Sequence, residues 1–128
     1  MLKYFYVILG GGIGSLLRYT VQGLTYKVVD SVFPWGTLCV NLIGCFVIGF
    51  LWELFERLTL SPDLRVFVFV GILGGFTTFS SYGLESSNLF RDGELGLGLF
   101  NMVTSNVLGI IFVLVGITLA RFLISYPR

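Results

Sequence analysis

Glycine and hydroxyl residues interrupt a long apolar stretch of this chain, and they carry its most distinctive chemistry. The stretch begins at Val66, and the interruption reads Gly74-Gly75-Phe76-Thr77-Thr78-Phe79-Ser80-Ser81-Tyr82-Gly83. Irregular backbone at membrane depth is tolerated only where protein buries it or where it lines a cavity. Interrupted membrane helices commonly form ion or substrate sites. The sequence therefore predicts a binding or transport site inside a membrane, at this break.

Two aromatic residues, Phe79 and Tyr82, directly follow the glycine and threonine residues of the break. The edge of an aromatic ring is electropositive, so an anion can lie against ring edges without a counter-charge. Backbone carbonyls released by a broken helix can in turn coordinate a cation. The break therefore offers chemistry for ions of either sign.

Polar side chains form a stripe on each of two other apolar segments. Thr37 and Asn41 are one turn apart in one segment, and Asn101 and Ser105 share a face of another. Two such stripes can build a polar track that carries no formal charge. The alternative is that these groups hydrogen-bond to each other and only hold the helices together.

The elements that must position these residues are membrane helices. Hydrophobic residues make up 55% of the chain and charged residues 12%, where a soluble domain has about 25% charged residues. A helix that spans a bilayer needs about 20 mostly apolar residues. We expect an all-α integral membrane protein, with one domain over residues 1–128, four transmembrane helices and a third helix broken near the midplane. The expected spans are about 4–26, 34–54, 66–90 and 95–124.

Small residues on the first and third spans predict close helix packing. Gly10, Gly14 and Arg18 share one face of the first span, and Gly71 and Gly75 repeat the small-xxx-small spacing in the third. The second pair suggests that two copies of the third span cross closely. Arg18 is either a fixed cation that attracts anions or a structural residue that reaches the interface or a helix end.

Basic residues are distributed with little bias between the two sides of the predicted bundle. One side carries Lys3, Arg57, Arg65, Arg121 and Arg128, and the other carries or lies near Arg18, Lys27 and Arg91. Orientation in the membrane follows the asymmetry of Lys and Arg, so a chain with little asymmetry can insert both ways up. We therefore expect an antiparallel, dual-topology homodimer.

Several classes of function are disfavoured by composition. The chain has no histidine, so we expect no metal-ligand cluster and no His-based catalysis. We expect a transport or binding protein and not an enzyme. We also expect no nucleic-acid partner. An internal disulfide is not expected either, because Cys39 and Cys45 fall on different faces of one helix. The carboxylates Glu53, Glu56 and Glu85 are expected at or near span ends, which argues against a proton-coupled cation exporter. Neutral donors and ring edges favour a small anion, since conduction requires binding that is not too strong.

The chain resembles the Fluc (CrcB-like) fluoride channel family over essentially its whole length. The resemblance is carried by Gly10-Gly11-Gly12-Ile13-Gly14 with Arg18, by Gly36-Thr37-Leu38 through Val40-Asn41-Leu42-Ile43-Gly44, and by Gly71-Ile72-Leu73-Gly74-Gly75-Phe76-Thr77-Thr78-Phe79-Ser80. It implies an antiparallel homodimer with two fluoride pores in a bacterial inner or plasma membrane. The function that it implies is passive export of cytoplasmic fluoride, which lowers fluoride toxicity.

The resemblance also assigns roles to individual residues. Asn41 matches the pore asparagine, and Phe79 matches the first aromatic residue of the family's paired phenylalanines. Tyr82 falls where many members carry the second phenylalanine, so it keeps a ring and adds a hydroxyl. Gly74 and Thr77 match residues whose backbone carbonyls hold a structural sodium ion between subunits. The polar track is assigned to Ser105, Asn101 and Thr37.

Two other classes of membrane protein compete with a fluoride channel. A small dual-topology multidrug or cation exporter is also four-span and dimeric, but it would need a carboxylate within a span. In a membrane assembly protein without transport activity, the glycines and amides would serve packing alone. A fluoride-efflux assay on liposomes distinguishes the three.

Overall fold

The computed structural model describes residues 2–125, and every regular element in that range is a helix. Arg128, one of the basic residues counted above, lies outside the described residues. The helices are α1 (Leu2–Val28), α2 (Trp35–Arg57), α3 (Pro62–Arg65), η1 (Val66–Leu73), α4 (Gly74–Phe76), α5 (Phe79–Arg91) and α6 (Leu95–Ser125). Together, α3, η1, α4 and α5 form one rod, and Thr77 and Thr78 break it.

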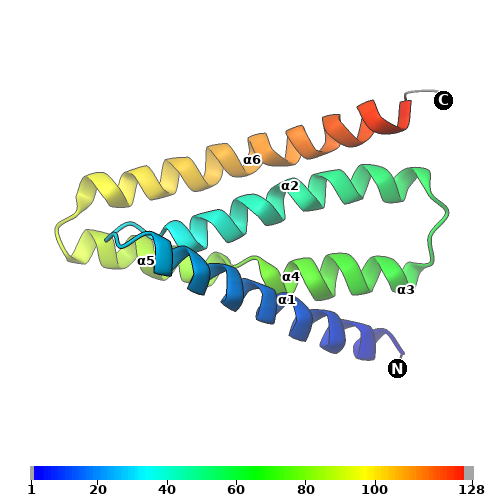
Figure 1. Ribbon diagram of the computed structural model, residues 1–128, viewed down its shortest axis with the longest axis horizontal. Coiled ribbons are helices and arrows are strands. Elements are labelled where there is room, and N and C mark those ends of the chain that lie inside the picture. The colour runs from blue at the N-terminus through cyan, green and yellow to red at the C-terminus, as the bar shows by residue number, and fades with distance from the viewer. Residues whose placement is uncertain (1, 126–128) are drawn as a thin grey trace.

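The rods run up and down the bundle in turn, so α1 begins and α6 ends at the same end of the molecule (Figure 1). α2 packs along α6, and α1 packs along η1 and α4. Short connections at residues 29–34, 58–61 and 92–94 join the rods. This arrangement brings α2, α6 and the broken rod around the interruption.

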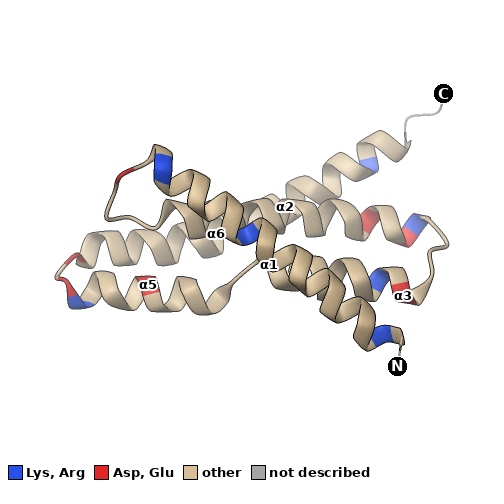
Figure 2. Ribbon diagram, turned by 60° about the horizontal axis from the view of Figure 1, so that its bottom comes forward, with Lys and Arg blue, Asp and Glu red and all other residues tan. Residues whose placement is uncertain are grey.

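Three helices within residues 2–125 are long and apolar enough to cross a membrane: Trp35–Arg57, the broken rod Pro62–Arg91, and Leu95–Ile124. They agree with three of the expected spans. α1 has a span's length but is not among these three, and its interior contains three consecutive glycines and Arg18. Charged residues otherwise lie mainly toward the two ends of the bundle (Figure 2).

The first half of the broken rod departs from the expected α-helix. Ser61 caps its start, since the Ser61 hydroxyl accepts a hydrogen bond from the Leu64 N–H at 3.3 Å, with Pro62 as the first helical residue. From Val66 to Leu73 the chain is wound as a π-helix. Windings of this kind are rare and occur frequently at functional sites, and here the π-helix leads directly into the break.

The glycine-rich faces of α1 and the broken rod pack against each other within one chain. A Cβ on Gly10 would lie 2.9 Å from the Gly71 Cα, and one on Gly75 would lie 2.6 Å from the Gly11 carbonyl oxygen. A Cβ on Gly14 would lie 2.1 Å from the Ile72 carbonyl oxygen. The prediction that Gly71 and Gly75 pair two copies of the third span is therefore wrong, because α1 of the same chain already fills that face.

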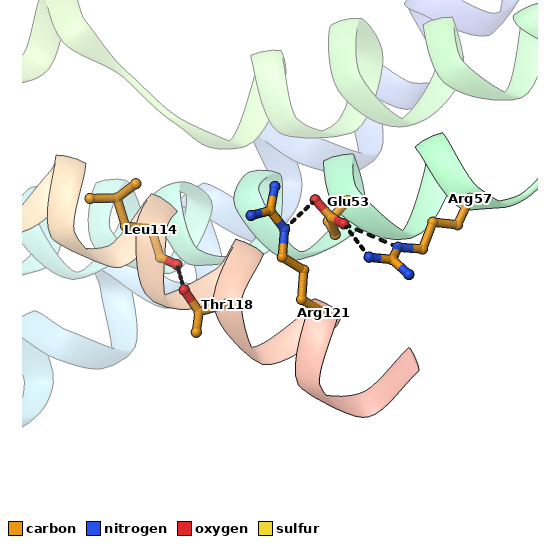
Figure 3. A network of polar contacts seen from close by, with 5 residues as sticks. All are labelled: Glu53, Arg57, Leu114, Thr118 and Arg121. Atoms are coloured by element: carbon orange, nitrogen blue, oxygen red, sulfur yellow. Dashed lines mark hydrogen bonds and ion pairs between the residues drawn. The ribbon is translucent and has the colours of Figure 1, made fainter. Parts of the chain in front are cut away.

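Two ion pairs to the buried Glu53 fasten α6 to α2 (Figure 3). Glu53 is 6% exposed. Its Oε1 lies 3.0 Å from Arg57 NH2, and its Oε2 lies 3.0 Å from Arg121 Nε. A carboxylate in this position is costly unless it is paired, and the two arginines offset that cost for Glu53.

Candidate functional site

The side chain of Asn41 closes the break between α4 and α5. Its Oδ1 accepts a hydrogen bond from the Thr78 N–H at 2.8 Å, and its Nδ2 donates to the Thr78 carbonyl at 3.0 Å. Thr78 is buried, so both its backbone N–H and its backbone carbonyl need partners. One amide from α2 therefore replaces the helical partners that Thr78 lacks.

The hydroxyls of Thr77 and Thr78 also bond to the local backbone of the break. The Thr78 hydroxyl accepts from the Ser81 N–H at 3.2 Å and so caps α5. The Thr77 hydroxyl donates to the Leu73 carbonyl at 3.0 Å. Threonine is thus used here for hydrogen bonds to the local backbone, which explains the hydroxyl-rich sequence of the break.

The same contacts release the carbonyls of Gly74 and Thr77 from the helical ladder. In a continuous α-helix the Gly74 carbonyl would accept the Thr78 N–H, which Asn41 takes instead. The Thr77 carbonyl would accept the Ser81 N–H, which the Thr78 hydroxyl takes instead. Free carbonyls suit a hard cation such as sodium, so the chemistry of both predicted ligands fits that role.

Arg18 reaches this group from α1. Its NH1 lies 3.5 Å from the Thr77 carbonyl oxygen, at the outer limit of a hydrogen bond. The guanidinium group thus links α1 to the break. Thr77 is the C-cap residue of α4, so this is a contact with a helix end, which is one of the two structural roles considered for Arg18. The Thr77 carbonyl keeps a second lone pair, since each backbone carbonyl has two.

A cavity of about 350 Å³ opens beside the break. Six of the predicted site residues line it, namely Asn41, Gly74, Thr77, Phe79, Tyr82 and Ser105. Apolar neighbours such as Ile48, Phe69 and Leu73 complete much of the wall. Residues from α2, the broken rod and α6 therefore meet around one mostly apolar space that has few polar groups.

Phe79 and Tyr82 stand together at the wall of this cavity. Their ring centroids are 5.3 Å apart, with an angle of 53° between the planes. Tyr82 is buried, whereas Phe79 is 80% exposed. An aromatic ring at a helix break that contacts so little of its own chain is available to a ligand or to another subunit.

Thr37 lies outside the lining of this cavity. Its hydroxyl accepts from Gln22 Nε2 at 3.0 Å and donates to Glu85 Oε1 at 2.7 Å, and Thr37 itself is 2% exposed. Glu85 sits in the middle of α5, in the last part of the span Pro62–Arg91. Its Oε2 is buried without a hydrogen-bond partner among the described residues.

Asn101 is also set back from the cavity, and it joins α6 to α5. It is 2% exposed, and its Nδ2 donates to the Ser86 hydroxyl at 2.9 Å. Ser105 lines the cavity and donates to Asn101 Oδ1 at 3.3 Å. Of the two residues on this stripe, only Ser105 reaches the cavity directly.

Asn106 is a cavity residue that the sequence analysis did not select. Its Nδ2 donates to the Tyr82 hydroxyl at 3.1 Å. It stands beside Ser105 but on another face of α6, so the stripe of Asn101 and Ser105 did not include it. An amide within an otherwise apolar segment was the available signal in the sequence.

Comparison with known proteins identifies the family. A family model described as "CrcB-like protein, Camphor Resistance (CrcB)" matches residues 5–117. The chain belongs to this CrcB-like family. It is 46% identical to a protein named Fluoride-specific ion channel FluC from Salinibacter ruber, over 99% of this chain and 96% of the relative. Proteins of the same name from Parabacteroides distasonis and Agrobacterium fabrum are each 45% identical, over 98% and 94% of this chain and 98% of each relative.

Membership in the family agrees with the sequence resemblance and places the chain in the cell membrane as a multi-pass protein. The relatives are named as fluoride channels and not as drug exporters. The match covers the cavity residues and the break in full.

Proposed function

We propose that this chain is the subunit of a fluoride-specific channel that exports cytoplasmic fluoride passively and is not an enzyme. The observation that carries the proposal is the cavity beside the break, where the Asn41 amide, the Ser105 hydroxyl and two aromatic rings meet. None of these groups has a formal charge. The names of close, full-length relatives support the same activity.

The lining of the cavity suits a small, strongly hydrogen-bonding anion. Asn41 uses one Nδ2 hydrogen on the Thr78 carbonyl and keeps a second one, since an amide has two donors. The edges of Phe79 and Tyr82 add positive potential without a fixed charge. Neutral donors hold an anion more weakly than arginine would, and this allows the anion to leave again. Ser105 would continue the path within the cavity, and Asn101 and Thr37, which do not line the cavity, would extend it beyond.

The working unit in this proposal is an antiparallel homodimer of four-span subunits with two pores. Two exposed groups support a second chain, namely the ring of Phe79 and the amide of Asn106 in the apolar helix α6. The ring of Phe79 would otherwise face lipid, and so would Oδ1 of Asn106, because among the described residues only the amide nitrogen of Asn106 is hydrogen-bonded; an amide oxygen left without a donor in lipid is costly. α1 serves as the fourth span, because it runs beside η1 and α4 along the bundle. Residues 1–128 then form a single membrane domain.

A structural sodium ion between the two subunits is the further part of this proposal. The released carbonyls of Gly74 and Thr77 would hold it, and two subunits would provide two of each. Arg18 limits this arrangement, because its guanidinium already approaches the Thr77 carbonyl. The ion therefore has to bind on the side of the carbonyl that faces away from α1. Sodium-dependent stability of the dimer, measured against a choline salt, tests this expectation.

Fluoride efflux from liposomes that contain the purified protein tests the main proposal. We expect efflux that needs no proton gradient and that protein-free liposomes do not show. Transport of an organic cation driven by protons, without fluoride efflux, would indicate the small exporter instead. No transport of either kind would indicate a protein of membrane assembly.

Labelling of single cysteines tests the dual topology. A cysteine placed at Asp92, in the connection between α5 and α6, should react with an impermeant reagent from both sides of the cell membrane. The native Cys39 and Cys45 are first replaced by serine or alanine to give a silent background. Labelling from one side alone would contradict the antiparallel dimer. A channel formed by parallel subunits would remain consistent with that result.

A further inference from the structure

The hydroxyl of Tyr82 is fixed by one specific contact with α6. Asn106 Nδ2 lies 3.1 Å from the Tyr82 hydroxyl oxygen and 2.7 Å from the Met102 carbonyl oxygen. The Met102 carbonyl can only accept a hydrogen bond, so the Asn106 atom that contacts it must be the amide nitrogen. The same nitrogen therefore donates its other hydrogen to Tyr82, and the phenol oxygen accepts.

This contact decides where the hydroxyl hydrogen of Tyr82 points. A phenol hydrogen lies close to the ring plane, on one side of the oxygen or the other. The Asn106 N–H occupies one side, so the hydrogen of Tyr82 is directed to the opposite side. Within residues 2–125 the hydroxyl has no other hydrogen-bond partner, and both residues line the cavity beside the break. Tyr82 is 8% exposed, so its ring is held in place by its surroundings.

We propose that Asn106 is a positioning residue that makes the Tyr82 hydroxyl a hydrogen-bond donor to the anion in this cavity. The inference rests on the proposed function. A phenylalanine at this position would offer only its ring edge, whereas the oriented hydroxyl adds an O–H donor on a residue that lines the same cavity as Asn41. Hydrogen bonds from a hydroxyl to an anion are short and about twice as strong as neutral ones. Tyr82 is thereby a specificity-determining residue for anions that accept hydrogen bonds strongly.

A double-mutant cycle with Tyr82→Phe and Asn106→Leu tests this pairing. The readouts are the rate of fluoride efflux from liposomes and the fluoride concentration that gives half-maximal efflux. We expect Tyr82→Phe to slow efflux about tenfold, the effect of losing one hydrogen bond to a charged group. Asn106→Leu should slow it about threefold, because the hydroxyl remains but is no longer oriented. The double variant should be no slower than Tyr82→Phe alone.

Two matched variants control for the loss of a polar group elsewhere. Tyr19→Phe removes a hydroxyl from a ring that is 78% exposed and outside the cavity lining. Thr118→Val removes a hydroxyl from α6 that donates only to the Leu114 carbonyl (Figure 3). Both should conduct at the wild-type rate, and all variants should elute from a sizing column like the wild type.

Three results would overturn the inference. Wild-type efflux from Tyr82→Phe would show that the hydroxyl does not contact the anion. An equal slowing by Asn106→Leu in the wild-type and Tyr82→Phe backgrounds would show that Asn106 acts without Tyr82. A wild-type protein that moves no fluoride would overturn the proposed function and this inference with it, whereas the first two results leave the proposed function intact.

Discussion

Replacement of Asn41 by aspartate changes one atom at the centre of the break. The Oδ1 that accepts the Thr78 N–H at 2.8 Å is kept, but the Nδ2 that donates to the Thr78 carbonyl at 3.0 Å becomes an oxygen. Two oxygens then face each other at hydrogen-bond distance, and the second amide hydrogen that we assign to the anion disappears. We expect Asn41→Asp to abolish fluoride efflux or to slow it at least a hundredfold.

The magnitude follows from the two contacts that are lost. Loss of the Nδ2 hydrogen bond and an unpaired buried carbonyl at Thr78 together cost about 2–4 kcal/mol. Loss of a donor to the anion raises the barrier by about 1.5–3 kcal/mol, a factor of roughly ten to a hundred in rate. Repulsion between the carboxylate and fluoride acts in the same direction.

The assay is fluoride efflux from liposomes with protein of verified dimer size. Asn88→Asp is the matched control, because it adds the same charge at an exposed site on α5 outside the cavity beside the break. It should conduct at nearly the wild-type rate. Asn41→Leu removes the acceptor as well, so hydrogen exchange at the Thr78 amide should accelerate in that variant but not in Asn41→Asp. Efflux near the wild-type rate from folded Asn41→Asp would refute the assignment and make the amide a purely structural group.

The other predictions concern the ring, the helix contact and the ion pair. Phe79→Ile should nearly abolish fluoride efflux while the dimer persists, because isoleucine removes the ring edge at a site where an exposed apolar residue adds little packing; wild-type efflux would show that the anion does not use this ring. Gly14→Val should prevent assembly or lower the free energy of unfolding by more than about 3 kcal/mol, since its Cβ would meet the Ile72 carbonyl. Gly23→Ala is the control, because a Cβ at Gly23 meets open space, and it should be tolerated in the same sizing and melting assays. Glu53→Gln should lower the melting temperature, because it weakens hydrogen bonds to charged groups on Arg57 and Arg121 that are themselves partly exposed; an unchanged melting temperature would mean that the network adds no stability.

The sequence was sufficient to place three of the helices and the break. Apolar runs bounded by charges gave α2, the broken rod and α6, because a membrane requires long apolar segments whatever their neighbours are. Gly74 and the threonines identified the break, since few other reasons place so many hydroxyls inside an apolar run. The π-helix from Val66 to Leu73 left no such signal, because its apolar residues are equally compatible with an ordinary α-helix.

Helical spacing identified faces correctly but not what each face contacts. Gly71 lies on a small-residue face as predicted, yet α1 of the same chain covers that face. Thr37 shares a face with Asn41, yet a rise of one turn is enough to move it from the cavity to a contact with Glu85. The contact between Asn106 and Tyr82 joins two helices, and no periodicity within either helix reports such a pair.

The break and the cavity are consequences of the same set of hydrogen bonds. A broken helix exposes N–H and carbonyl groups that must be paired in a membrane. Asn41 and the Thr78 hydroxyl take the N–H groups of Thr78 and Ser81, and this leaves the carbonyls of Gly74 and Thr77 without their helical donors. The N–H groups of Thr78 and Ser81 are therefore satisfied within the chain, while two carbonyls are left for other partners. Because the Asn41 amide also faces the cavity, one side chain both holds the break open and offers a donor to an anion, so stability and conduction cannot be varied independently at this position.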